Sequence, residues 1–333
     1  MRMNFKTKKV LNKRSTNKFI YPIYGFFRQN FAVLAGFILI SVFFTVMSNK
    51  FLSFDNIMSV LRQISTNALL AFGMAFVMIT GGIDLSVGSM VAIAGTFTVG
   101  MCVSGMPIPA AILLSVGLCT LLGAISGIVI SKSGMPAFIV TMAMMQMGRG
   151  VAYIYTGGQP IHFNNETYNY LGNGYVGVIP FPVIVMIVVL MILNITLSKS
   201  RFGKYVYAIG GNREAARFSG VNIFRVEVVV YLISAMLSGI AGVILSARLY
   251  SAIPTVGDGF ELDAIAATVL GGTSFTGGRG NMIGTMIGVM IIGVITNGLN
   301  LLKVPFYYQL ILKGLIIVFA VYLDTVKRKR TGT

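Results

Sequence analysis

The sequence predicts an all-α membrane protein with about ten transmembrane helices, and three observations support this fold class. Apolar residues make up 56% of the 333 residues and charged residues only 11%, whereas soluble domains hold about 45–50% and about 25%. Long apolar runs recur along the chain, and a helix needs about 20 such residues to cross the hydrocarbon core. The mean hydropathy of +0.83 would oblige a soluble fold to expose more apolar surface than a monomer tolerates. A soluble enzyme, a disordered tail and a secreted disulfide scaffold are therefore excluded.

Ten apolar segments are the candidate spans of a transmembrane domain that we expect to cover residues 30–325. A basic tail, residues 1–29, precedes this domain, and a second basic tail, residues 326–333, follows it. The second and the eighth segments are short and run into a Gly-Gly pair, so we expect ten spans, or eight if these two do not cross fully. In order, the segments are Phe31–Met47, Asn67–Thr80, Val87–Val103, Pro109–Ile130, Ala137–Tyr155, Pro182–Leu197, Val226–Ala247, Leu262–Phe275, Met282–Leu299 and Tyr307–Leu323.

The charges of the chain indicate topology and not a nucleic-acid partner. Lys and Arg number 26 against 9 Asp and Glu, which gives a net charge of +17. If the N-terminus lies inside and ten spans alternate, 20 of the 26 basic residues fall on the inner side. Such a bias is typical of cytoplasmic segments of membrane proteins. We therefore expect both termini in the cytoplasm and no binding of nucleic acid.

The residues needed for several kinds of chemistry are missing from the sequence. Cys102 and Cys119 both fall inside apolar runs and imply no disulfide framework. His162 is the only histidine, which argues against a histidine metal cluster or a Ser–His pair. The phosphate-binding pattern G-x-x-x-x-G-K-[ST] does not occur. We expect this chain to bind no metal and no cofactor, and to hydrolyse no nucleotide on its own.

A faint internal repeat links the two short segments. Residues 80–88 (TGGIDLSVG) are similar to residues 270–278 (LGGTSFTGG), and each stretch follows a short apolar run. In the ten-span topology both stretches face the same side, as they would in a parallel repeat of the kind found in transporters. Chance similarity in a chain with 39 glycines is the alternative.

Polar residues inside the spans are mostly uncharged, and their hydroxyl and amide groups suit a neutral solute such as a sugar. Hydrogen bonding between helices is the other explanation for them. Asp84 follows a Gly-Gly pair where a helix can break, and it is either part of a solute pathway or an N-cap of the span that begins at Val87. The candidate pathway or gating residues are Asn67, Thr80, Gly81, Gly82, Asp84, Ser86, Thr141, Gln146 and Asn297.

Few charged side chains lie within the apolar segments, where they are costly. Arg149 either pairs with a carboxylate or a backbone carbonyl in the bundle or lies near an interface. Lys313 is long enough to extend outward to the interface. Glu261 and Asp263 open the short eighth segment, where acidic residues favour a helix N-terminus. A proton relay would need more buried acids than these, which argues against an ion-coupled mechanism.

Three stretches resemble the permease subunits of ribose-type ABC sugar importers, which also serve xylose, galactose and arabinose. They are residues 80–89 (TGGIDLSVGS), 208–222 (AIGGNREAARFSGVN) and 259–274 (GFELDAIAATVLGGTS). The resemblance covers nearly all of residues 30–325 and is closest to ribose permeases. It implies a homodimer, a cytoplasmic ABC ATPase that binds the ATP and Mg, and an extracytoplasmic sugar-binding protein.

The segment 198–225 is too polar to cross the bilayer, and Glu214–Phe218 is predicted to form a short helix between Gly210-Gly211 and Gly220. A surface connector is one interpretation of this helix. By the resemblance, it is instead the segment that couples the membrane domain to the ATPase. The implied coupling residues are Arg213, Glu214, Ala215, Ala216, Arg217, Phe218, Ser219 and Gly220.

The resemblance implies a non-enzymatic subunit that moves a monosaccharide, with ribose as the first expectation, across the bacterial inner membrane. The alternative is an ion-coupled secondary carrier of a small polar solute, which would work without an ATPase. A membrane-embedded enzyme would need a nucleophile with its base, or paired catalytic carboxylates, and the sequence offers neither.

Overall fold

The computed structural model describes residues 20–331, which form helices joined by short connections and four two-residue strands. The elements are α1 (Ile20–Met47), α2 (Phe54–Ile79), α3 (Val87–Val103), α4 (Ile108–Ser133), α5 (Ala137–Thr156), β1 (Ile161–His162), α6 (Glu166–Asn173), β2 (Tyr175–Val176), β3 (Ile179–Pro180), α7 (Phe181–Lys199), α8 (Arg201–Gly211), α9 (Arg213–Phe218), α10 (Ile223–Leu249), β4 (Ser251–Ala252), α11 (Phe260–Leu270), α12 (Met282–Leu301) and α13 (Phe306–Thr331).

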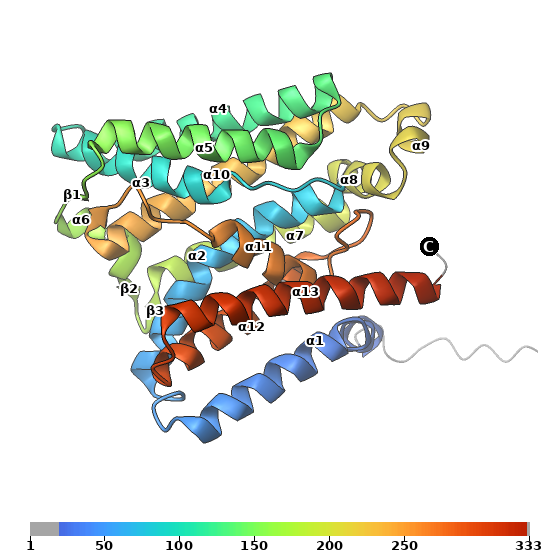
Figure 1. Cartoon of the computed structure of the whole chain (residues 1–333), viewed down its shortest axis with the longest axis horizontal. Coiled ribbons are helices and arrows are strands. Elements are labelled where there is room, and N and C mark those ends of the chain that lie inside the picture. Colours follow the sequence, from blue (N-terminus) through green and yellow to red (C-terminus); the bar gives the residue numbers. More distant parts are fainter. Residues whose placement is uncertain (1–19, 332–333) are drawn as a thin grey trace, which may run out of the picture.

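The long helices lie roughly along one axis, with successive helices antiparallel, and are arranged in layers (Figure 1). Helices α4 and α5 cover one side, α1 and α13 cover the other, and α2, α3, α10 and α11 lie between them. Helix α6 and the strand pairs β1–β4 and β2–β3 gather at one end of the bundle, which we call the α6 end. Helices α8 and α9, the beginning of α1 and the end of α13 lie at the opposite end, the α9 end (Figure 1).

Six of the described helices, namely α2, α4, α5, α7, α10 and α12, are long and apolar enough to cross a bilayer. Helix α3 has 17 residues, which at 1.5 Å per residue gives a length of about 26 Å. Large apolar side chains on the outside of the bundle are exposed, among them Leu113 on α4 and Ile154 on α5. The chain is therefore a polytopic helical membrane protein.

Four segments differ in extent from the sequence prediction. One of them is α13, which runs to Thr331 and so contains residues 326–331 of the predicted second tail. The segment predicted as Asn67–Thr80 is the second half of α2, which begins at Phe54 and has 26 residues. The segment predicted as Leu262–Phe275 is the short helix α11, with 11 residues. Helix α1 begins at Ile20 and so contains residues 20–29, which were predicted as part of a tail. The rest of that tail, residues 1–19, and residues 332–333 of the second tail lie outside the described residues.

The core of the bundle is built around α10, which contacts α2, α3 and α4. Its approach to α4 is close because α4 carries Gly123 and Gly127 on one face. A Cβ atom on Gly123 would lie 2.6 Å from the carbonyl oxygen of Tyr231, and one on Gly127 would lie 2.7 Å from Cα of Val228. This Gly-x-x-x-Gly pattern therefore serves close packing between α4 and α10.

The two stretches of the predicted repeat share one backbone turn. Gly81 ends α2 with φ +87° and Gly272 ends α11 with φ +88°, a left-handed conformation that glycine adopts without strain. The same pattern of backbone hydrogen bonds closes both turns. At the end of α2, Gly81 donates to Met78 and Gly82 donates to Val77. At the end of α11, Gly272 donates to Val269 and Thr273 donates to Thr268. Gly81 thus matches Gly272 in the structure, whereas the alignment of residues 80–88 with residues 270–278 pairs it with Gly271. The parallel repeat itself stays a prediction.

Candidate functional site

A non-helical segment, residues 80–86, connects α2 to α3 within the bundle, and it is visible as a stretch without helix in Figure 1. Thr141 of α5 holds this segment, because its hydroxyl donates to the carbonyl of Ile83 at 3.1 Å. Thr80 caps the preceding helix, with its hydroxyl donating to the carbonyl of Val77 at 2.7 Å. Irregular backbone inside a membrane domain is tolerated where protein surrounds it, and transporters place such breaks at their solute sites.

Asp84 is the charged residue of this segment, and it is buried, with 2% of its surface exposed. Its Oδ1 accepts hydrogen bonds from the backbone N–H of Ser86 at 3.0 Å and from the Ser86 hydroxyl at 2.6 Å. Its Oδ2 accepts a hydrogen bond of 2.7 Å from the hydroxyl of Ser234 on α10. The N-cap position of α3 is occupied by Ser86. Asp84 is therefore not the N-cap residue itself, and its carboxylate ties the segment to α10.

One face of α10 touches the segment at Gly82 and at Asp84. Tyr231 lies one turn before Ser234, and its hydroxyl packs so closely against Gly82 that a Cβ there would overlap it. Glu227 lies one turn further back and is 4% exposed. Residues spaced by four and three positions share one side of a helix. The side chains of Glu227, Tyr231 and Ser234 therefore form a single row that we call the polar row of α10.

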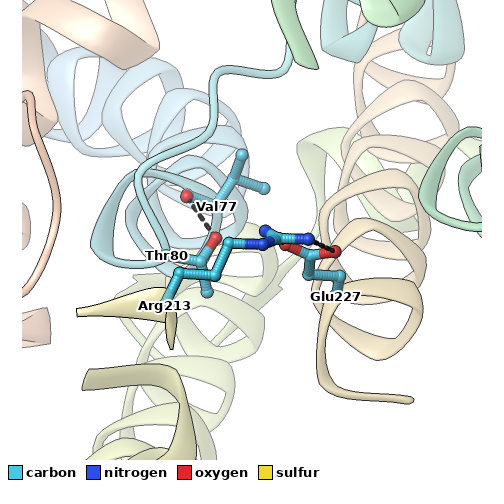
Figure 2. Close-up of polar contacts among 4 residues, drawn as sticks. All are labelled: Val77, Thr80, Arg213 and Glu227. Atoms are coloured by element: carbon cyan, nitrogen blue, oxygen red, sulfur yellow. Dashed lines mark hydrogen bonds and ion pairs between the residues drawn. The ribbon is translucent and has the colours of Figure 1, made fainter. Parts of the chain in front are cut away.

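The polar row begins at an ion pair with α9 (Figure 2). The guanidinium of Arg213 binds the Glu227 carboxylate with two hydrogen bonds, Nη1 to Oε1 and Nη2 to Oε2, the second at 3.1 Å. The Arg213 side chain is 47% exposed and that of Glu227 only 6%, so the pair spans the boundary between solvent and protein. A cavity of about 280 Å³ adjoins the pair and is lined also by Thr80, Gly81 and Tyr231.

Helix α9 is a short, solvent-facing helix that is fastened at both ends. Asn212 caps its N-terminus by accepting a 2.9 Å hydrogen bond from the N–H of Ala215. Gly220 ends it with φ +82°, and Ala216 is its buried contact with the protein. Phe218 is 87% exposed, the highest fraction among the large apolar side chains that the structure describes. The predicted helix at Glu214–Phe218 is confirmed, with one more residue at its start.

Glycines bring α8 into contact with the end of α2 and with the connection between α11 and α12. The N–H of Gly278 donates to the carbonyl of Ile79 at 2.9 Å. Gly210 of α8 packs between these two groups, so that a Cβ on it would overlap the Ile79 oxygen and lie 2.5 Å from the Gly278 nitrogen. Tyr207 donates to the carbonyl of Gly280 at 2.7 Å, and burial raises the pKa of Tyr207. The phenol therefore stays protonated as a donor near neutral pH.

Arg149 holds the irregular stretch that precedes α11. Its Nη1 donates to the carbonyls of Pro254 and Val256, each at 2.7 Å. The same stretch touches the start of α3, where Gly88 and Gly257 are packed too closely for any side chain. Of the two predicted roles for Arg149, pairing with backbone carbonyls in the bundle is the one confirmed.

The structure brings together six of the nine predicted pathway residues, namely Thr80, Gly81, Gly82, Asp84, Ser86 and Thr141. The remaining three lie elsewhere. Asn297 of α12 exchanges two amide hydrogen bonds with Asn56 of α2, at 2.8 and 3.0 Å. Asn67 is half-buried on α2, and Gln146 is exposed in the middle of α5. The contacts of Asn297 match hydrogen bonding between helices, the alternative explanation for such residues.

Lys313 does not extend to the interface as predicted. Its Nζ lies 2.8 Å from Oδ2 of Asp263 in the first turn of α11, and the two side chains are 22% and 12% exposed. The reason is that α13 packs against α11, which offers the ammonium a nearby carboxylate. The predicted position of Glu261 and Asp263 in the first turn of a helix is confirmed.

Sequence reasoning missed Glu227, Tyr231 and Asn56. A signal existed for Glu227, because it is a lone acidic residue one position into an apolar run. Tyr231 carried no such signal, and Asn56 lies in a stretch that was not predicted to be helical. Within residues 20–331, no group of three or more His, Cys, Asp or Glu side chains is placed to hold a metal ion.

The long apolar helices, the broken segment between α2 and α3 and the exposed helix α9 together define a multi-pass membrane permease. A family model described as "Branched-chain amino acid transport system / permease component" matches residues 56–321. The chain belongs to this family of transport permeases and is a multi-pass protein of the inner membrane.

Relatives within the family cover almost the whole chain. The chain is 46% identical over 301 residues to the ribose import permease protein RbsC of Bacillus subtilis (strain 168), which covers 90% of this chain and 94% of the relative. It is 42% identical over 316 residues to the RbsC protein of Haemophilus influenzae, covering 94% and 97%. It is 36% identical over 324 residues to the D-allose transport system permease protein AlsC of Escherichia coli (strain K12), covering 97% and 98%. No solved structure matches the chain.

Proposed function

We propose that this chain is the membrane subunit of an ATP-driven ABC importer that carries a monosaccharide, ribose being the first candidate, across the bacterial inner membrane. The similarity to ribose import permeases over about nine-tenths of both chains supports the substrate. The uncharged hydroxyl groups near the segment 80–86 are of the kind that binds a neutral sugar. ATP hydrolysis then belongs to a partner, and this chain binds neither ATP nor Mg.

Ten helices cross the bilayer in this proposal, with α11 as a partial span. They are α1, α2, α3, α4, α5, α7, α10, α11, α12 and α13. Both termini and α9 then lie in the cytoplasm. The beginning of α1 and the end of α13 lie at the α9 end of the bundle (Figure 1), which supports this topology. The basic residues of the segment 199–225 are at the same end, as the positive-inside rule requires.

The observation that carries the proposal is the geometry of α9. This capped six-residue helix protrudes from the bundle and presents an 87% exposed phenylalanine, which offers an apolar contact to a partner surface. In an importer of this class the partner is the cytoplasmic ABC ATPase, and the coupling residues are Arg213–Gly220. Arg213 then points back to Glu227, while Phe218 points away from the membrane domain and docks in the ATPase.

Two copies of the chain form the pathway between them in this proposal. Gln146 is exposed in the middle of α5, at a depth where a polar side chain facing lipid would be costly. A pathway between two copies would give this amide a hydrated environment. A sugar-binding protein docks at the α6 end and supplies the specificity, so that the pathway itself binds sugar weakly and releases it.

Alternating access follows from movement of the two ATPase domains. ATP binding closes them, α9 of each copy follows, and the helices switch between outward-open and inward-open packing. The sugar is passed from its binding protein into the pathway and leaves on the cytoplasmic side.

A purification experiment tests this function. The tagged chain is isolated in mild detergent from its native membranes, and the co-purified proteins are identified by mass spectrometry. We expect an ATPase with a phosphate-binding loop at near-equal stoichiometry, and we expect its loss when Phe218→Asp is combined with reversal of the charges of Glu214 and Arg217. Purification of the chain without an ATPase in several detergents would contradict the proposal and would favour an ion-coupled carrier.

A further inference from the structure

We propose that the polar row of α10 transmits movement of α9 to the segment 80–86, with the Arg213–Glu227 ion pair as the joint. This inference deepens the proposed function and rests on it for the source of the movement. A positioning role thereby falls to Arg213, Glu227 and Ser234.

The joint holds because Glu227 is buried. A carboxylate that is 4% exposed loses most of its hydration, and Arg213 is the cation that compensates it. Moving α9 away from α10 would leave that charge unpaired inside the protein, which is costly. The two hydrogen bonds of the pair also fix the angle between guanidinium and carboxylate. Helix α9 and the beginning of α10 therefore move as one body.

The polar row carries the movement inward along a continuous helix. Ser234 lies seven residues after Glu227, about 10 Å along the helix axis. At that level its hydroxyl binds Oδ2 of Asp84, and between the two levels Tyr231 packs against Gly82. A shift or rotation of α10 at Glu227 is thus applied to the segment at two points, one by packing and one by a hydrogen bond.

The segment 80–86 is the element that can respond. It is not helical, it contains the left-handed turn at Gly81, and the cavity of about 280 Å³ gives its first residues space on the side of Arg213. The backbone N–H groups of residues 80–82 bind the last turn of α2. Beyond that turn, side chains hold the backbone, with Thr141 binding the carbonyl of Ile83 and Asp84 binding the N–H of Ser86. Segments held by side chains in this way can switch between discrete positions when their contacts shift.

Hydrogen–deuterium exchange on the purified permease tests the transmission without any substrate. We expect Arg213→Glu to raise the exchange rate in peptides covering residues 80–86 by about threefold or more, and the double reversal of Arg213→Glu with Glu227→Arg to return it toward the wild-type rate. Ser234→Ala should raise it as well. Ser238→Ala is the matched control, because Ser238 is also buried on α10 and its hydroxyl donates only to the Ser234 carbonyl.

Transport in proteoliposomes with the co-purified ATPase and the binding protein gives the second readout, the labelled ribose taken up per ATP hydrolysed. We expect a fall of about tenfold for Arg213→Glu and of about threefold for Ser234→Ala, against no change for Ser238→Ala.

Unchanged exchange in residues 80–86 for Arg213→Glu, or equal behaviour of the two serine variants, would overturn the inference. If the charge reversals fail to insert, the two serine variants decide the question. Absence of uptake by the wild type would count against the proposed function, while the exchange result would still stand.

Discussion

The hydroxyl of Ser234 donates a 2.7 Å hydrogen bond to Oδ2 of Asp84, although the two residues are 150 positions apart in the sequence. The bond joins α10 to the non-helical segment between α2 and α3. Both partners are buried, so neither group can exchange this contact for water without opening the bundle. The relationship explains how a non-helical stretch is held inside a bundle of membrane helices.

Replacing Asp84 tests how much this arrangement stabilises the fold. Asp84→Ala removes the acceptor for the N–H and hydroxyl of Ser86 and for the hydroxyl of Ser234. We expect a loss of about 1–3 kcal/mol in the free energy of unfolding, measured by denaturation of the purified protein in detergent. Asp55→Ala, at an exposed position in the first turn of α2, is the control and should cost only the charge at a helix N-terminus, about 0.3–1 kcal/mol. Equal stability of the two variants would show that the Asp84 contacts contribute little.

Two adjacent glycines of α8 should respond in opposite ways to alanine. A Cβ on Gly210 would overlap the carbonyl of Ile79, so Gly210→Ala must separate α8 from α2. A Cβ on Gly211 meets nothing within 4 Å, so Gly211→Ala should be neutral or slightly stabilising. Fluorescence-detected size-exclusion chromatography after heating compares the two. A Gly210→Ala variant as heat-resistant as the wild type would mean that this contact is looser than described.

Removing one charge of the Lys313–Asp263 pair should lower the free energy of unfolding more than removing both charges. Lys313→Met leaves the Asp263 carboxylate, which is 12% exposed, without its cation. We expect a loss of about 1–3 kcal/mol in the free energy of unfolding, given that the pair keeps some contact with solvent. The double variant with Asp263→Leu and Lys313→Met should recover most of it. A double variant no more stable than Lys313→Met would contradict this account.

Asn297 is expected to act in packing and not on the solute. Its amide exchanges two hydrogen bonds with Asn56 between α12 and α2, and such pairs between membrane helices contribute about 0.6–2 kcal/mol. Asn297→Ala should lower the stability by an amount in this range, and the combination with Asn56→Ala should cost little more. Uptake per folded molecule should stay at the wild-type level. A fall in uptake at unchanged stability would return Asn297 to the pathway.

Local signals in the sequence predicted the helices well where the chain changes composition sharply. Gly210-Gly211 and Gly220 delimited α9. The eighth segment was predicted to end at Phe275, whereas α11 ends at Leu270, before the Gly-Gly pair where Gly272 takes a left-handed turn. The start of α2 was missed because polar residues interrupt its apolar run. Among them, Arg62 lies over the ring of Tyr175 at 5.2 Å, which accommodates the charge at the α6 end.

The contacts between distant residues could not be predicted from one sequence. Glu227, Lys313 and Asn297 each bind a side chain that is 14, 50 and 241 positions away respectively. The sequence shows that these polar side chains lie in or next to apolar segments, where an unpaired polar group is energetically unfavourable. The packing of the helices determines which side chain each of them binds. The group around Asp84 was partly predictable, because residues 80–86 are adjacent in sequence, whereas Ser234 and Tyr231 join it only in the folded chain.

In the proposed function, ATP hydrolysed by a partner ATPase drives sugar uptake by this chain. Proteoliposomes that contain the purified permease with its co-purified ATPase and the sugar-binding protein are given labelled ribose, with and without ATP. We expect uptake that requires ATP and the binding protein, and that is indifferent to imposed proton or sodium gradients. Uptake that follows an ion gradient in liposomes containing this chain alone would contradict the account.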